Sequence, residues 1–159
     1  MGGAIDTHVQ TAQIILLLVS ADFLASDYCY DREMQQAMAR HTAGDARVIP
    51  VILRPTDWHS APFGRLQALP TDGRPITRWS DQDEAFLDVA IGIRAVAEQM
   101  HVSPIRVFLS APSDVADERN LARDLLCMKL PYDPHLRGKV AFTVESWDNP
   151  AAPMALSTC

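Results

Sequence analysis

The chain lacks the cysteine pairs, the long apolar runs and the excess of basic residues that mark several large classes of protein. Its three cysteines, Cys29, Cys127 and Cys159, lie far apart and form no CxxC pair. This spacing excludes a cysteine-based metal finger and predicts reduced thiols in a cytoplasm, with no bound metal. The longest apolar run, residues 14–19, is far shorter than the roughly 20 residues that span a bilayer, so we expect no membrane partner.

Positive charge is scarce as well. The 14 Lys and Arg residues are outnumbered by 20 Asp and Glu residues, which gives a net charge of -6. This acidic balance argues against nucleic acid as a partner. The motifs GxxxxGK[ST] and GxGxxG do not occur, so a phosphate-loop NTPase is not encoded in this stretch. A composition of 48% hydrophobic and 21% charged residues over 159 positions is typical of a globular protein with one domain, or one domain and part of another.

Hydrophobic periodicity predicts strands that alternate with helices, and hence an α/β fold with a parallel sheet. Two continuous apolar runs, residues 13–20 and 46–53, indicate strands buried on both faces, and Pro50 indicates a position near an edge. The stretch "RPITRW" at 74–79 is expected to add a short third strand. Three helices are expected, over residues 4–12, 28–42 and 81–100. Ser80 is the expected N-cap of the last one.

A second unit begins after the linker "HVSP" at residues 101–104. Its pattern predicts a strand over 105–110, a helix over 115–129 and a strand over 140–147. One strand–helix–strand unit of this size is too small to bury a core alone. The sequence therefore predicts two domains, residues 1–102 and 103–159, of which the second is partial.

Three stretches of the first unit carry a family resemblance: "LVSADFLASDYC", "IPVILRPTDW" and "RWS". Together they are similar to the later part of a bacterial Toll/interleukin-1 receptor (TIR) domain, over about residues 4–100. The resemblance implies a flavodoxin-like fold, in which helices cover both faces of a parallel sheet. It also implies that the first strands of the domain and a cleft-forming loop would have to precede Ile5, so that this sheet would be incomplete at its N-terminus, with three strands of five.

The same resemblance implies signal transduction, or bacterial defence, through assembly with other TIR domains. Many members of the family cleave NAD at the nicotinamide–ribose bond, so NAD would be a substrate and no resident cofactor is implied. Carried over to this sequence, the family's essential glutamate is Glu33, the aromatic residue before it is Tyr28, and its loop tryptophan is Trp58. The aromatic rings of Tyr28 and Trp58 would bind the substrate by stacking on the leaving base. A single carboxylate suits this chemistry. Nicotinamide leaves from a cationic nitrogen and needs no general acid, whereas an oxocarbenium-like ribose needs a nearby negative charge.

Two alternatives stay open for the whole chain: a non-catalytic association module with an unpaired sheet edge, and an inactive gene fragment. For Glu33 the alternative is a solvated charge on a helix. The stretch "RVFLSAPSDVADERNLARDLL" of the second unit resembles the opening of a domain found in large bacterial signalling proteins, which suggests a ligand or partner site. An ordinary helix start with Asp114 as N-cap is the alternative there. The residues that match are Ser110, Ser113, Asp114, Glu118 and Arg119.

Overall fold

A computed structural model describes residues 2–100, 104–137, 141–146 and 155–158, without the side chains of residues 2–6, 28, 29, 113 and 155–158. Five strands form one sheet in the order β2-β1-β3-β4-β5. The first four are parallel, and β5 runs antiparallel to β4. The strands are β1 (Ile14–Val19), β2 (Arg47–Ile52), β3 (Ile105–Ser110), β4 (Phe142–Ser146) and β5 (Ala155–Thr158). The predicted class, a parallel sheet with flanking helices, is confirmed.

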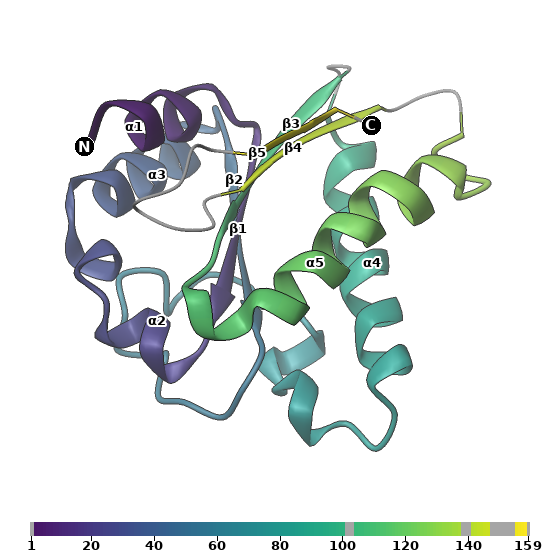
Figure 1. Ribbon diagram of the computed structural model, residues 1–159, viewed down its shortest axis with the longest axis horizontal. Coiled ribbons are helices and arrows are strands. Elements are labelled where there is room, and N and C mark those ends of the chain that lie inside the picture. Colours follow the sequence, from purple (N-terminus) through teal and green to yellow (C-terminus); the bar gives the residue numbers. More distant parts are fainter. Residues whose placement is uncertain (1, 101–103, 138–140, 147–154, 159) are drawn as a thin grey trace.

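Helices cover both faces of this sheet, as Figure 1 shows. One face carries α1 (Gly2–Thr11), α2 (Ala21–Ala25) and α3 (Arg32–Ala43). The other face carries α4 (Gln82–Glu98) and α5 (Ala116–Asp124). A π-helical turn, Leu125–Lys129, prolongs α5, and short 3-10 turns lie at Asp27–Tyr30, Thr71–Gly73, Ile76–Arg78, Ser113–Val115 and Leu130–Tyr132. Within the described residues, no helix is both long and apolar enough to cross a membrane.

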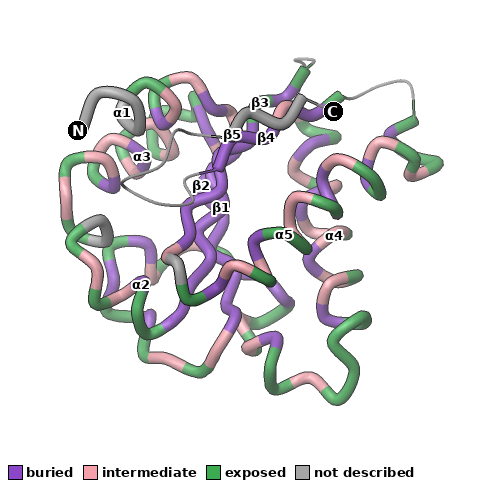
Figure 2. Tube along the Cα trace, viewed as in Figure 1, coloured by how far each residue is buried: buried purple, intermediate pink, exposed green. Residues whose placement is uncertain are grey.

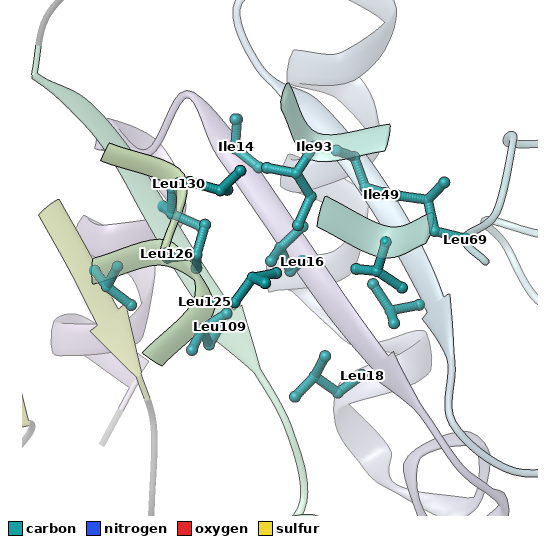
Figure 3. Close-up of a cluster of buried hydrophobic side chains, with 14 of the residues drawn as sticks. Ile14, Leu16, Leu18, Ile49, Leu69, Ile93, Leu109, Leu125, Leu126 and Leu130 are labelled. Atoms are coloured by element: carbon teal, nitrogen blue, oxygen red, sulfur yellow. The ribbon is translucent and has the colours of Figure 1, made fainter. Parts of the chain in front are cut away.

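The apolar run of β1 is continuous because both of its faces are buried, as predicted. Residues 14, 16 and 18 face α4 and α5 in one core cluster, and residues 15, 17 and 19 face α1, α2 and α3 in the other. Figure 2 shows β1, β2, β3 and β4 as the buried centre of the molecule. Figure 3 shows the first cluster, where Leu16 of β1, Ile93 of α4 and Leu125 come together from three elements.

The ends of the helices follow local capping chemistry. Asp31 is the N-cap of α3, and its carboxylate accepts hydrogen bonds from the backbone N–H groups of the second and third residues after it. Gly44 ends α3 in the left-handed region at φ 85°, where a residue without Cβ is favoured. The predicted N-cap of α4 was wrong by one residue. Asp81 rather than Ser80 caps that helix and accepts from the N–H of Asp83.

The predicted third strand at residues 74–79 is wrong. The segment instead forms the 3-10 turn Ile76–Arg78, with Ile76 buried in the core. Pro75 has no N–H to donate to a neighbouring strand, and the backbone N–H of Thr77 reaches the carbonyl of Leu53 just past the end of β2. The place beside β2 is taken by Leu69, which forms an isolated parallel bridge with Val51.

The sheet joins the two units predicted from the sequence. Strand β3 lies directly between β1 and β4, so residues 105–110 pair with residues 14–17. The second unit thus supplies strands to the sheet that was expected to hold only three. The proposed boundary between residues 102 and 103 falls among residues 101–103, outside the described part of the chain, and stays a prediction.

The thiols were predicted to be reduced, and for Cys127 this is wrong, because Cys127 is disulfide-bonded. The wide sequence spacing of the cysteines gave no indication of a pair, because a bridge depends on proximity in the folded chain.

Candidate functional site

The order of the strands defines where a ligand would enter this type of sheet. From β1 the chain passes through α2 and α3 to β2 on one side, whereas from β2 it returns through α4 to β3 on the other side of β1. The connections therefore diverge between the carboxyl ends of β1 and β3. Open α/β sheets bind ligands in the crevice at such a switch point.

Glu33 stands at this end of the sheet. Since α3 runs from the carboxyl end of β1 back to the amino end of β2, its first turn lies on the side of the strand tips. Glu33 occupies that first turn and is partly exposed. A carboxylate at a helix N-terminus is favoured by the helix dipole and by free N–H groups. Glu33 is thus partly accessible, at the end of the sheet where open α/β folds bind ligands, and its catalytic role stays a prediction.

A second carboxyl group, which sequence reasoning did not select, lies beside Glu33. The Asp31 side chain accepts hydrogen bonds from the backbone N–H groups of Glu33 at 3.1 Å and Met34 at 3.3 Å. Burial, together with the hydrogen bond and the negative charge of Glu33, raises the pKa of Asp31 to about 6, although the N–H bonds oppose the shift. Asp31 could have been found as an N-cap residue from its place before the helix, but its proximity to Glu33 as an acid pair was not visible.

Tyr28 was predicted to contact the substrate's base. Its backbone lies in the 3-10 turn Asp27–Tyr30, which follows α2 and leads into α3. The side chain of Tyr28 lies outside the described part of the structure, so its predicted role stays a prediction.

Trp58 has a largely structural environment. The side chain is only 7% exposed and belongs to the core cluster that also holds Met34. Its ring stacks on His59 with centroids 4.0 Å apart. A Cβ added at Gly73 would come within 2.6 Å of the Trp58 ring, so the two pack closely. What remains exposed lines an open cavity of about 560 Å³, and Glu33 is not among the residues that line it.

Glu33 and Trp58 lie on the same side of the sheet, and the residues that line the cavity beside Trp58 do not include Glu33. Met34, the residue after Glu33, belongs to the same core cluster as Trp58. Among the described residues, no group of three or more His, Cys, Asp and Glu side chains could hold a metal ion.

The two acidic residues of the second unit's motif, Asp114 and Glu118, form ion pairs with a residue of the first unit. Arg54, which follows β2, donates to the carboxylate of Asp114 at 3.0 Å and to that of Glu118 at 3.1 Å. Asp114 was considered as the N-cap of α5, and this is wrong, because α5 begins after Val115 without a side-chain cap. Ser110 and Arg119 of the same motif are buried. The motif therefore fixes α5 to the end of β2.

The structure is a doubly wound α/β sheet with helices on both faces, and Glu33 lies in the helix turn nearest the carboxyl end of β1. Residues 2–88 match the TIR domain family, which is more than half of the chain, so the chain belongs to that family. It is 67% identical over 94 residues to the uncharacterized protein y4lF of Sinorhizobium fredii, an alignment that covers 59% of this chain and 29% of that protein. The aligned part of the chain thus spans less than a third of this relative's length. No solved structure matches it.

Membership of this family makes the chain a signalling module that works through protein–protein interaction. The match covers the stretches that carried the resemblance in the sequence, including "LVSADFLASDYC" and "IPVILRPTDW".

Proposed function

We propose that this TIR module cleaves NAD at the nicotinamide–ribose bond, with Glu33 as the catalytic carboxylate. The observation that carries the proposal is the position of Glu33: partly exposed, in the first turn of α3, at the carboxyl end of the sheet. Tyr28 and Trp58 are the proposed aromatic contacts to the dinucleotide. NAD serves as substrate, so the reaction uses no resident cofactor.

The proposed reaction needs little proton transfer. The bond between ribose C1′ and the nicotinamide nitrogen breaks, and its electron pair neutralises the positive charge of that nitrogen. The positive charge passes to the ribose, where the negative Glu33 stabilises it. Water then adds to C1′ and releases a proton. The neighbouring Asp31, which is mostly ionised above its pKa of about 6, increases the negative potential at this point.

Release of nicotinamide by the purified chain tests the proposal. We expect wild-type protein to release nicotinamide from NAD, and Glu33→Gln to lower the rate by about 100-fold or more, a loss typical for an electrostatic catalytic group. Glu84→Gln is the matched control, because Glu84 is an exposed glutamate in the first turn of another helix, α4. Release that is equal in the Glu33→Gln and Glu84→Gln variants would contradict the assignment.

A second function, assembly with other TIR domains, is favoured by the surface of α4. Leu87 and Ile91 lie one turn apart and are 60% and 46% exposed. Exposed apolar side chains at this spacing are typical of a helix that contacts a partner. We expect sedimentation velocity to show concentration-dependent association that Leu87→Ser weakens, and a strictly monomeric wild-type protein would contradict this function.

A further inference from the structure

The residues that line the cavity of about 560 Å³ beside Trp58 carry positive charge, whereas the molecule as a whole is negative. The chain carries a net charge of -6, yet two arginines and no acidic residue line this cavity. It is bounded by Pro55, Thr56, Trp58, Gly73, Arg74, Pro75 and Arg78. Its residues come from two segments, the loop after β2 and the loop before α4.

The two arginines have no acidic partner among the described residues. In the described part of the chain, the basic partner of every ion pair is His8, Arg54 or Arg94, and never Arg74 or Arg78. The Arg74 guanidinium donates to the backbone carbonyl of Arg78 at 2.8 Å, which places the two residues side by side. Two uncompensated guanidinium groups at one cavity repel one another, and an anion between them relieves that repulsion.

The loop that presents Arg74 and Arg78 is held at several points. The Thr71 N–H and hydroxyl both donate to the carboxylate of Asp88 on α4, at 2.6 and 2.8 Å. The Trp79 indole N–H donates to the carbonyl of Arg74 at 3.2 Å, and the Arg74 guanidinium lies 5.4 Å from the centroid of the Trp79 ring. Arg74 is therefore oriented before any ligand arrives, which lowers the entropy cost of binding.

From this arrangement we propose that the cavity beside Trp58 binds a phosphorylated small molecule, with Arg74 and Arg78 holding the phosphate. The planar guanidinium group donates two parallel N–H bonds to phosphate oxygens. The Thr56 hydroxyl supplies a further hydrogen-bonding group, and Pro55 and Pro75 offer apolar contact to the rest of the ligand. The proposed site shares Trp58 with the proposed NAD contacts, but it does not include the catalytic carboxylate Glu33.

A titration of the full chain tests the site, with two-dimensional amide NMR as the readout. The ligands are sodium pyrophosphate, inorganic phosphate and ADP-ribose. We expect saturable shifts of the amide signals of residues 56–58, 73–74 and 76–79 with pyrophosphate, since Pro55 and Pro75 have no N–H, and at least tenfold weaker binding in Arg78→Gln. This substitution is the informative one, because the Arg78 side chain forms no hydrogen bond, ion pair or ring contact with the described residues, so its loss should leave the fold intact. Arg78→Lys should bind at an intermediate strength. Tighter binding of ADP-ribose than of pyrophosphate would identify a nucleotide ligand, and equal binding a simple phosphate ligand.

Arg65→Gln is the control for net charge, since Arg65 is an exposed arginine outside the cavity. The proposal is overturned if Arg65→Gln weakens pyrophosphate binding as much as Arg78→Gln does, or if none of the three ligands shifts the cavity residues. Nicotinamide release is not a readout here, so a failure of the site and a failure of NAD cleavage are separate results.

Discussion

Asp31 combines a structural role with an unfavourable charge. Its carboxylate caps α3, while burial and the neighbouring Glu33 raise its pKa from 3.8 to about 6. The folded state thus binds a proton more tightly than the unfolded state does, so the free energy of unfolding falls as the pH rises from about 4 through 6. At neutral pH the charge of Asp31 opposes folding.

Asp31→Asn separates the cap from the charge. Asparagine caps a helix about as well as aspartate but does not ionise, so we expect the variant to be more stable than wild type at pH 7 by about 1 kcal/mol, a value reduced for partial exposure to solvent. At pH 4 the difference should disappear. Urea unfolding at the two pH values measures this, and an equal difference at both would show that Asp31 has no raised pKa.

At the scale of single residues, the role of Glu33 was predicted from a local motif and stays a prediction, and nothing in the sequence indicated the groups around it. The position of Glu33 follows from a local motif, which a linear sequence records. The approach of Asp31 to Glu33 follows from cap geometry, and the salt bridges of Arg54 to Asp114 and Glu118 join residues about 60 positions apart. Such contacts depend on tertiary packing, which hydrophobic periodicity does not encode.

At the scale of elements, β2 is the edge strand that Pro50 indicated, and this edge is closed rather than open. The outward N–H of Val48 donates to His41 Nδ1 at 3.1 Å, and that of Ile52 donates to the carbonyl of Leu69 at 2.8 Å. Pro50, between them, has no N–H. The expected association through an unpaired edge is therefore not available along β2, since its outward donors are already satisfied.

His41 makes this closure sensitive to pH. Burial and the positive charge of Arg47 lower its pKa from 6.5, and only the neutral imidazole can accept the hydrogen bond of Val48. The unfolded state takes up a proton more readily, so the stability contributed by His41 is present above pH 6.5 and is lost as the pH falls through the lower, folded pKa.

His41→Asn and His41→Ala test this closure as a pair. Asparagine offers an acceptor oxygen near the place of Nδ1 and does not titrate, so we expect the loss of stability below pH 6.5 to become smaller. Alanine leaves the Val48 N–H without this acceptor and should cost about 1–3 kcal/mol at neutral pH. Thermal unfolding between pH 5 and 8 measures both effects, and an unchanged pH slope in His41→Asn would assign the slope to other groups.

Elements with strong periodicity were predicted well, and elements governed by loop chemistry were not. The strands at β1 and β2 and the helix α4 follow from long apolar patterns. The segment 74–79 has an apolar and aromatic content that favours a strand, but its proline, Pro75, and the turn at Gly73, with φ 66°, prevent a continuous ladder. The edge place beside β2 went to Leu69, a residue in a stretch without any strand pattern.

At the scale of the whole molecule, one sheet unites residues on both sides of the proposed boundary at 102 and 103. Arg54 binds α5, Arg94 of α4 donates to Asp133 at 2.9 Å, and the backbone N–H of Arg106 donates to the Gln13 side chain at 2.7 Å. Strand β3 also contributes Phe108 to the core cluster on the face of α1, α2 and α3. The family match ends at residue 88, but the core that contains its residues also includes residues beyond that position, such as Phe108.

Phe108→Ala tests whether the chain unfolds as one unit. Phe108 is 1% exposed and packs in the same cluster as Phe23 and Met34, so its loss should lower the free energy of unfolding by about 3–5 kcal/mol. Because β3 is the inner neighbour of β1, hydrogen exchange of β1 and β2 amides should accelerate together with that of β3. Met128→Ala, at a side chain 68% exposed, should change stability by no more than about 0.5 kcal/mol. If the β2 amides of Phe108→Ala stayed protected from hydrogen exchange while the β3 amides lost their protection, the two units would unfold separately. Residues 1–102 would then be a domain whose stability does not depend on the strands of the second unit.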